Sequence, residues 1–357
     1  MKNKNLVRSL VFSGLVIALL LTLCNLFEYN NDHSSQRMQT YHDLKRNSVD
    51  AVMIGTSGMD RFWIGAKAYE EHGISMYPVT TEGMPSWVTV PMLKEAEKRQ
   101  NLKLVVMDMR SFVGSYPKES QKFDVQSRRA IDILDFFSLT RFEAIVNTHK
   151  AIKQAEVEDA PAIDISYFLS FVRYHGMWEE EGFSFNELKN PKSKYMGFYM
   201  HKDYTVSPIQ EYTPTVNTDE RIPLDPVAQT WLDEFLKYIA KKDYEVLFLQ
   251  TPSTRTRTEA GRLNTLKDYL EARGYECLVL GINEAIYDLE KDFYNDGHVN
   301  YYGAEKFTEF FAAYLKEKYD LPDRRGDKKC AAWEGVYDVI KQQITKFEEA
   351  AASTTTE

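Results

Sequence analysis

The chain has 357 residues, more than one compact core usually holds, so two or three structural units are expected. Its 53 acidic and 44 basic residues give a formal net charge of −9, which argues against a nucleic-acid-binding protein, because such proteins need a clustered basic surface. Hydrophobic residues make up 43% of the chain, which is enough for a packed core and excludes wholesale disorder.

The amino-terminal segment has the pattern of a membrane anchor. Three basic residues within the first eight precede an uncharged run over residues 10–27, which would reach about 27 Å as a helix, close to the roughly 30 Å of bilayer hydrocarbon. The basic residues favour a cytoplasmic amino terminus. We therefore predict an uncleaved anchor that holds the remaining chain outside the cytoplasm. A cleaved signal peptide is one alternative, and lipid modification of Cys24 is another.

Beyond a polar segment rich in Asn, Ser, His and Gln, short apolar runs alternate with helical patterns. The runs resemble buried parallel strands and lie at residues 49–55, 74–79, 102–107, 245–249 and 276–280. The helical patterns lie at residues 87–96, 226–239, 263–270 and 307–315. Strands that alternate with helices predict an α/β fold with a parallel sheet and right-handed crossovers.

The alternation is interrupted between residues 119 and 224. This stretch contains two predicted helices, at 124–137 and 141–155, and then a segment rich in aromatic residues. One interpretation is a helical cap with its own small core. The other is a lid that shapes a substrate groove, because aromatic rings stack on sugars and cover acyl chains.

At the carboxyl end, apolar residues recur at helical spacing between 333 and 347 and predict a helix docked on the body, followed by a loose tail. A helix that binds a partner is the alternative. The predicted units are therefore an anchor, a stalk, the first half of an α/β domain, an aromatic-rich helical insertion, the second half of that domain, and a terminal helix with its tail. They cover residues 1–28, 29–47, 48–118, 119–224, 225–322 and 323–357.

A short segment after the first predicted strand, Gly55-Thr56-Ser57-Gly58, could hold a nucleophile. In open α/β sheets, ligands bind at the carboxyl ends of the strands, and small neighbours let backbone N–H groups approach an oxyanion. Met59 stands where the G-x-S-x-G pattern has its second glycine. By itself the segment also fits a plain turn or an anion-binding loop.

A second segment, just before the last helix, contains the candidate general base. His298 lies there among amide and carboxylate neighbours, and an imidazole held by such groups could accept the proton of Ser57. The other six histidines lack this setting. By itself His298 also fits a loop residue that caps the helix.

Together, Gly55-Thr56-Ser57 and the segment around His298 resemble the SGNH/GDSL hydrolase superfamily. Behind a membrane anchor, they are similar to its envelope branch, which includes the D-alanyl transfer protein of teichoic acid modification and alginate O-acetylation proteins. The resemblance spans about residues 49–117 and 226–320. It implies a three-layer α/β/α, flavodoxin-like parallel sheet, here with a large helical insertion and an amino-terminal transmembrane helix.

By this resemblance Ser57 is the nucleophile and His298 is the general base. The backbone N–H groups of Ser57 and Gly83 would bind the oxyanion. The family has an asparagine as a third oxyanion donor, whereas Asp108 and Arg110 stand at that place here. Arg110 is therefore either a charged oxyanion donor or the partner of Asp108 in a structural ion pair.

The third member of the triad also departs from the family pattern. The family usually has an aspartate three residues before the histidine, but that position is Asn295 here and Asp296 is two residues before it. Either Asp296 orients the imidazole from a shifted loop, or Asn295 does so weakly, at a cost of about 10⁴ in rate. Asp108 and Asn300 are the candidate substrate-binding residues.

These features predict an extracytoplasmic O-acyl esterase or O-acyltransferase that acts on a cell-envelope glycan through an acyl-enzyme on Ser57. The expected partner is a cell-envelope polysaccharide or an acylated glycan, a membrane-bound acyltransferase is a further candidate, and no nucleic acid is expected. The alternative is a catalytically degenerate module that binds glycan or such an acyltransferase. This acyl-enzyme chemistry needs no metal or nucleotide cofactor, and none is expected. The three cysteines lie far apart and form no zinc-site pattern. A phosphate-binding protein is disfavoured, because the glycine loop lacks the usual lysine.

Overall fold

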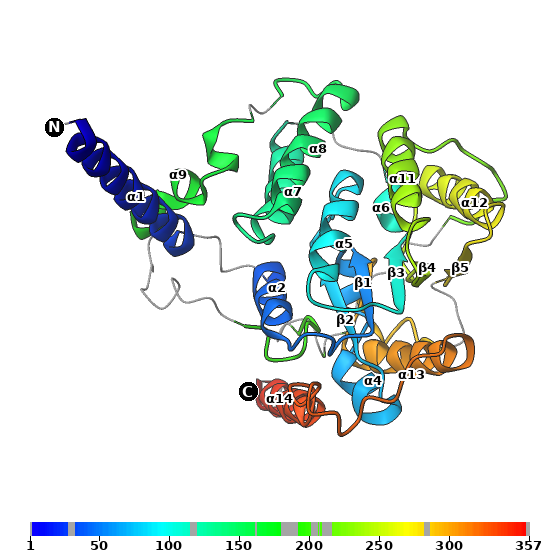
Figure 1. The fold of residues 1–357 in the computed structure, drawn as a ribbon. Helices are drawn as coiled ribbons and strands as arrows, with labels where there is room; N and C mark the ends of the chain where they lie inside the picture. The colour runs from blue at the N-terminus through cyan, green and yellow to red at the C-terminus, as the bar shows by residue number, and fades with distance from the viewer. Residues whose placement is uncertain are drawn as a thin grey trace.

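The protein is built around a five-stranded parallel sheet (Figure 1). A computed structural model describes residues 2–27, 33–114, 120–160, 163–179, 192–200, 206, 208, 216–281 and 286–354. The strand order is β2-β1-β3-β4-β5, the flavodoxin-like order, and the predicted fold class is confirmed. The strands are β1 (Ala51–Gly55), β2 (Met76–Thr80), β3 (Leu104–Asp108), β4 (Glu245–Gln250) and β5 (Glu276–Val279).

Helices cover both faces of the sheet because alternate residues of each buried strand point to opposite sides. Val52 and Ile54 of β1 pack into one core cluster, whereas Ala51 and Met53 pack into another. The first cluster lies under α5 (Thr89–Glu97), α11 (Pro226–Ile239) and α12 (Arg257–Glu271). The second lies under α4 (Gly65–His72), α13 (Tyr301–Lys318) and α14 (Val336–Thr354). The short connecting helices are α3 (Ser57–Asp60), η1 (Ser86–Val88) and α6 (Arg110–Val113).

Local sequence signals set the starts of two of these helices. Asp225 accepts a hydrogen bond from the backbone N–H of Val227 at 2.9 Å, and Pro226 occupies the first turn of α11. Thr256 and Glu259 form a reciprocal capping box at the start of α12. Both helices then bury the apolar stripe that the sequence predicts.

The predicted insertion contains α7 (Ser120–Asp132), α8 (Leu139–Ala155), η2 (Ile165–Tyr167), α9 (Ser170–Tyr174) and η3 (His175–Glu179). It does not form a separate core, because Ala144, Ile145 and Ile152 of α8 join the cluster on the α5 face of the sheet. Part of the aromatic-rich stretch, including Phe183 and Phe185, lies outside the described residues.

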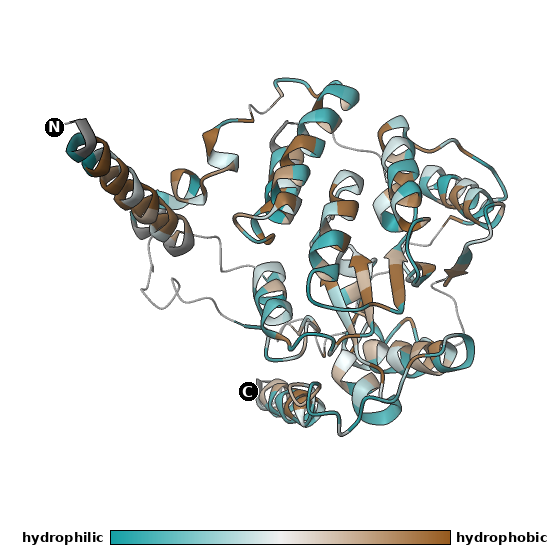
Figure 2. Ribbon diagram, viewed as in Figure 1, coloured by the Kyte–Doolittle hydropathy of each residue, from teal (hydrophilic) through white to brown (hydrophobic). Residues whose placement is uncertain are grey.

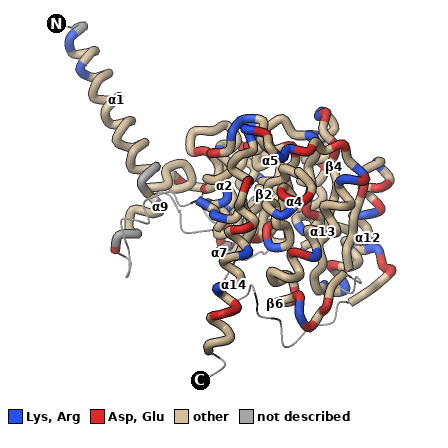
Figure 3. Tube along the Cα trace, turned by 90° about the horizontal axis from the view of Figure 1, so that it is seen from below, with Lys and Arg blue, Asp and Glu red and all other residues tan. Residues whose placement is uncertain are grey.

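The amino-terminal helix α1 (Lys2–Leu26) projects away from the body (Figures 2 and 3). Its segment Lys4–Cys24 is long and apolar enough to cross a membrane, a property that anchors and signal sequences share. Charged residues lie only near its amino terminus (Figure 3).

The segment predicted as a polar stalk instead contains the packed helix α2 (His33–Asp43). Met38 and Tyr41, three residues apart, enter the core, and Arg37 forms a buried ion pair with Asp60 at 2.5 Å. The prediction failed because only two large apolar residues mark the buried face of this polar helix. Its cost of burial is offset by charge pairing, which composition does not reveal.

The carboxyl-terminal helix α14 is present where the sequence predicts it, and its residues Ile340 and Ile344 are buried against the body. The helix continues through Thr354, so the predicted loose tail is helical over most of its length. Residues 355–357 lie outside the described residues.

Candidate active site

Ser57 lies at the carboxyl end of β1 and begins α3. The fully buried carboxylate of Asp108 accepts hydrogen bonds from the backbone N–H of Thr56, at 2.9 Å, and from the Thr56 hydroxyl. This contact requires glycine at position 55, since a Cβ there would stand 2.1 Å from the Cβ of Asp108. Asp108 therefore supports the segment Gly55-Thr56-Ser57-Gly58, the serine loop, from inside the sheet, and does not take the predicted role of contacting a substrate.

His298 lies on a short antiparallel hairpin, β6 (Phe293–Asn295) and β7 (His298–Val299), which leads into α13. Asn300 caps that helix by accepting a hydrogen bond from the backbone N–H of Gly303 at 3.1 Å. Its amide nitrogen donates to the carbonyl of Lys291, and the side chain is buried. Asn300 thus fixes where the hairpin ends and the helix begins, which differs from its predicted role in substrate binding.

The structure brings the hydroxyl and the imidazole together. The Oγ of Ser57 lies 2.9 Å from Nε2 of His298, and Nδ1 of His298 lies 2.9 Å from Oδ1 of Asn295. The same Oδ1 accepts the backbone N–H of Gly297 at 2.9 Å. This second bond fixes the amide orientation, because the alternative orientation would place an NH₂ group against an N–H donor. Nδ1 must then carry the proton, which leaves Nε2 as the acceptor for the serine hydroxyl.

The two candidate triad members, Asn295 and Asp296, occupy different places. The amide of Asn295 contacts the imidazole. Asp296 presents its backbone carbonyl to the N–H of Thr254 at 2.8 Å, which ties the hairpin to the segment after β4. The imidazole is thus oriented by a neutral amide, three residues before the histidine.

The pKa of His298 is lowered from 6.5 to about 2, chiefly by burial and further by the positive charges of Arg61 and Arg110. The imidazole is therefore neutral at ordinary pH and able to accept a proton. An imidazolium formed by proton transfer from Ser57, however, would have two cations nearby and an amide where a carboxylate usually stands. This arrangement provides the correct tautomer but little stabilisation of the charged form.

Arg61 is a site residue that the sequence motifs did not reveal. Its guanidinium donates to the hydroxyl of Tyr294 at 2.6 Å and to the carboxylate of Glu82 at 2.8 Å. The Nη1 atom lies 3.5 Å from Nδ1 of His298, and the guanidinium covers the ring of Tyr199. The one available signal in the sequence is its position four residues after Ser57, one helical turn further along the chain.

Gly83, the candidate oxyanion donor, lies between β2 and η1 with a φ of +65°, a conformation that favours glycine. The preceding residue, Glu82, binds Arg61 as above and Arg129 of α7 at 3.1 Å. The loop that carries Gly83 is therefore held between Arg61, beside His298, and α7 of the insertion.

Arg110 was predicted to be an oxyanion donor or the ion-pair partner of Asp108, but its side chain mainly contacts backbone carbonyls. Its guanidinium donates to the carbonyls of Pro252 at 2.8 Å and Gly297 at 3.3 Å, while its backbone N–H donates to Asp108. A Cβ on Gly58 would stand only 2.7 Å from this guanidinium. Arg110 thus clamps the serine loop, the segment after β4 and the histidine hairpin together. Gly58, which has no side chain, makes room for this guanidinium.

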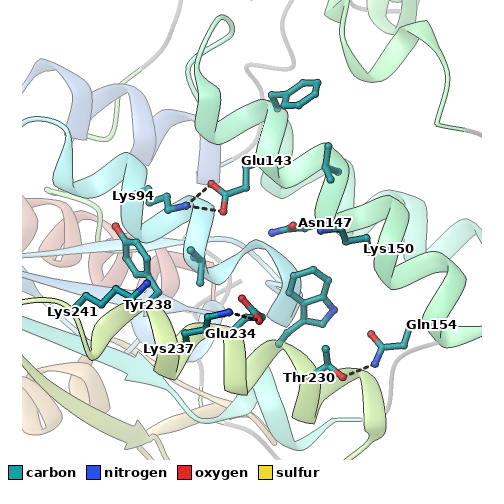
Figure 4. A pocket seen from close by; sticks show the side chains of 14 residues that line it. Lys94, Glu143, Asn147, Lys150, Gln154, Thr230, Glu234, Lys237, Tyr238 and Lys241 are labelled. Carbon is teal, nitrogen blue, oxygen red and sulfur yellow. Dashed lines mark hydrogen bonds and ion pairs between the residues drawn. The ribbon is translucent and has the colours of Figure 1, made fainter.

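Ser57 and His298 are both half-buried, so neither is sealed beneath the surface. A separate cavity of about 640 Å³ lies between α5, α8 and α11 (Figure 4), and neither residue lines it. Its polar side chains largely satisfy one another, as Lys94 with Glu143 and Gln154 with Thr230. That cavity is therefore not part of the candidate active site.

No known protein family and no curated protein matches the chain. Among solved structures, an acetyl xylan esterase from the rumen bacterium Butyrivibrio proteoclasticus is similar, with a TM-score of 0.33 and 9% sequence identity. The similarity covers 76% of this chain and 64% of the esterase, so the chain spans less than two thirds of that protein's length. A similarity at this level does not assign an activity.

Proposed function

We propose that the protein is a membrane-anchored serine O-acyl esterase or O-acyltransferase that acts outside the cytoplasm on a cell-envelope glycan. The observation that carries the proposal is the hydrogen-bonded series from Ser57 Oγ to His298 Nε2 and from His298 Nδ1 to Asn295 Oδ1, each at 2.9 Å. Nucleophile, base and orienting group stand in the order that acyl transfer requires.

In the first step, Nε2 of His298 takes the hydroxyl proton of Ser57 as Oγ forms a bond to the acyl carbonyl carbon. The negative charge that develops on the carbonyl oxygen would be held by the backbone N–H groups of Ser57 and Gly83. The imidazolium then gives its proton to the departing sugar oxygen, and the ester bond breaks to leave an acyl-serine.

In the second step, His298 removes a proton from water or from an acceptor hydroxyl as that oxygen attacks the carbonyl carbon of the acyl-serine. The bond between this carbon and Oγ then breaks, and the imidazolium returns the proton to Ser57. Water would make the protein an esterase, and a sugar hydroxyl would make it a transferase. The helix α1 supports work on lipid-linked or wall polymers, because an anchor of this kind keeps the domain at the membrane.

The alternative is a degenerate module that binds glycan or a membrane-bound acyltransferase. Asn295 and the low pKa of His298 favour it, since both make the imidazolium costly to form. The two readings differ in one measurable property, the reactivity of the Ser57 hydroxyl.

Labelling of the purified full-length protein by a fluorophosphonate tests the proposal. The wild type should become labelled, because the probe reacts only with an activated serine. Ser57→Ala should abolish the label, and Ser353→Ala, on the exposed part of α14, should leave it unchanged. An unlabelled wild type that also releases no acyl group from model esters would favour the binding module.

A further inference from the structure

A patch of exposed apolar side chains lies on the insertion. Outside α1, most exposed large hydrophobic side chains among the described residues fall between residues 137 and 168. This apolar patch consists of Phe137, Leu139, Phe142, Ile165 and Phe168, and Leu139 and Phe137 are 86% and 71% exposed. The rings of Phe142 and Phe168 are 6.4 Å apart, so the two parts of the patch meet.

The same insertion contacts the end of α1. Two residues after Phe168, α9 begins at Ser170, whose hydroxyl donates to the carbonyl of Cys24 at 2.7 Å. Cys24 and Ser170 are both buried in this contact. Figure 1 shows α9 beside the carboxyl end of α1, and Figure 2 shows apolar residues in the connection between α7 and α8 and in the segment that leads to α9.

We propose that the apolar patch rests in the interfacial layer of the bilayer that α1 crosses. Its continuity with the end of α1 identifies lipid as the occupant, because a spanning helix brings whatever packs on its end to the membrane surface. Exposing large apolar side chains to water is unfavourable, whereas burying them at the boundary between headgroups and acyl chains is favourable. This inference rests on α1 as an anchor and not on the chemistry of Ser57.

A second contact with the membrane would have a definite consequence. A single spanning helix leaves the domain free to rotate and tilt about one attachment. With the apolar patch seated on the lipid, the domain has two attachments on the same side. The insertion then acts as a support that fixes how the domain faces the envelope, in addition to packing on the sheet.

A fluorophore that senses polarity can test this in the full chain. Leu139→Cys carries the label NBD, and Val339→Cys on α14, also exposed but outside the patch, serves as the matched control. Both are reconstituted into phosphatidylcholine vesicles with plain or brominated acyl chains. The unsubstituted protein gives the background, which should be small because Cys24 and Cys330 are buried and burial raises the pKa of the Cys277 thiol to about 12.

We expect the label at position 139 to show blue-shifted emission and at least a twofold loss of intensity in brominated vesicles, with little change at position 339. Phe168→Cys should behave like Leu139→Cys. Water-like emission at all three positions would overturn the proposal. Blue-shifted emission that appears only in native membranes and never in pure lipid vesicles would also overturn it, because that result assigns the patch to a protein partner. Adding Ser57→Ala should leave the signal unchanged, which separates this test from the fluorophosphonate test.

Discussion

The two sides of the candidate active site are built in different ways. The serine side stands at the end of a central, fully buried parallel strand, with the carboxylate of Asp108 beneath it. The histidine side stands on a hairpin of two short strands and is held by polar contacts, chiefly the Asn295 amide and the Arg110 clamp. Rigidity on the serine side therefore comes from the core of the sheet, whereas the histidine side depends on single hydrogen bonds.

This difference indicates which substitutions should affect folding and which should affect the proposed reaction at Ser57. The groups beneath Ser57 are part of the sheet, so changing them should alter the folding of the protein. The groups around His298 lie outside the sheet, so changing them should alter the charge and orientation of the imidazole while the fold remains. The predictions below use this contrast.

The largest effect is expected from Asn295→Asp. A carboxylate at this position would still accept the N–H groups of Gly297 and His298, and it would stabilise the imidazolium that forms as Ser57 attacks. Replacing the aspartate of a triad by asparagine costs about 10⁴ in rate, so the reverse change should accelerate acylation by about 10²–10⁴. The measurement is the rate of fluorophosphonate labelling.

Asn295→Ala is the matched control for that experiment. It removes the group that fixes the tautomer and adds no charge, so its labelling should be slower than that of the wild type. If Asn295→Asp reacts no faster than the wild type, the amide is not what limits the reactivity of Ser57. The hairpin would then have to be out of place for catalysis.

The sequence predicts the sheet well, because each strand follows a short apolar run, and β1, β2 and β3 are buried throughout. It also predicts that Ser57 and His298 meet, because one follows the first strand and the other precedes the last helix of the α/β domain. It does not predict which way a side chain points once the chain is folded. Asp108 and Asn300 were therefore expected at the substrate and instead support the serine loop and the start of α13.

Contacts between distant segments are the second kind of feature that escapes the sequence. Arg61 reaches Glu82 and Tyr294 only because β2 and the histidine hairpin lie beside α3 in the fold. The helix α2 was missed for the same reason, since its Arg37 finds Asp60 across 23 positions of sequence. No periodic pattern within either segment marks such a pair.

The next largest effect should be on stability, from Asp108→Asn. The carboxylate accepts from Thr56 with one oxygen and from the backbone N–H of Arg110 with the other. An amide has only one acceptor atom, so one of these sides would face an NH₂ group and lose its bond. We expect a loss of about 1–3 kcal/mol in the free energy of unfolding, measured by chemical denaturation.

The control for this variant is Asp243→Asn, an exposed residue before β4 that should change stability by less than about 0.5 kcal/mol. Asp108→Asn should also slow the labelling of Ser57, since it loosens the loop that carries the hydroxyl. Unchanged stability together with slow labelling would mean that Asp108 acts on the reaction itself and not through the serine loop.

The smallest effect should appear in the dependence of stability on pH. The pKa of His298 is about 2 in the folded protein and about 6.5 when the chain is unfolded. Below pH 6.5 the unfolded chain therefore binds a proton that the folded protein does not, and the contribution of His298 to stability falls as the pH falls. Above pH 6.5 the imidazole is neutral in both states and contributes no slope.

His298→Gln removes this titration while keeping a polar side chain at the site. Between pH 7 and pH 5, the wild type should lose stability relative to the variant by at most about 1.4 kcal/mol per pH unit, because one proton is involved. Denaturation curves recorded at both pH values give the difference directly, and the titration of carboxylates cancels because both proteins share it. If the difference in stability between wild type and variant is the same at both pH values, the imidazole is protonated in the folded protein as readily as in water. In that case the hairpin does not shield His298, and the contrast between the two sides of the site lies in rigidity alone.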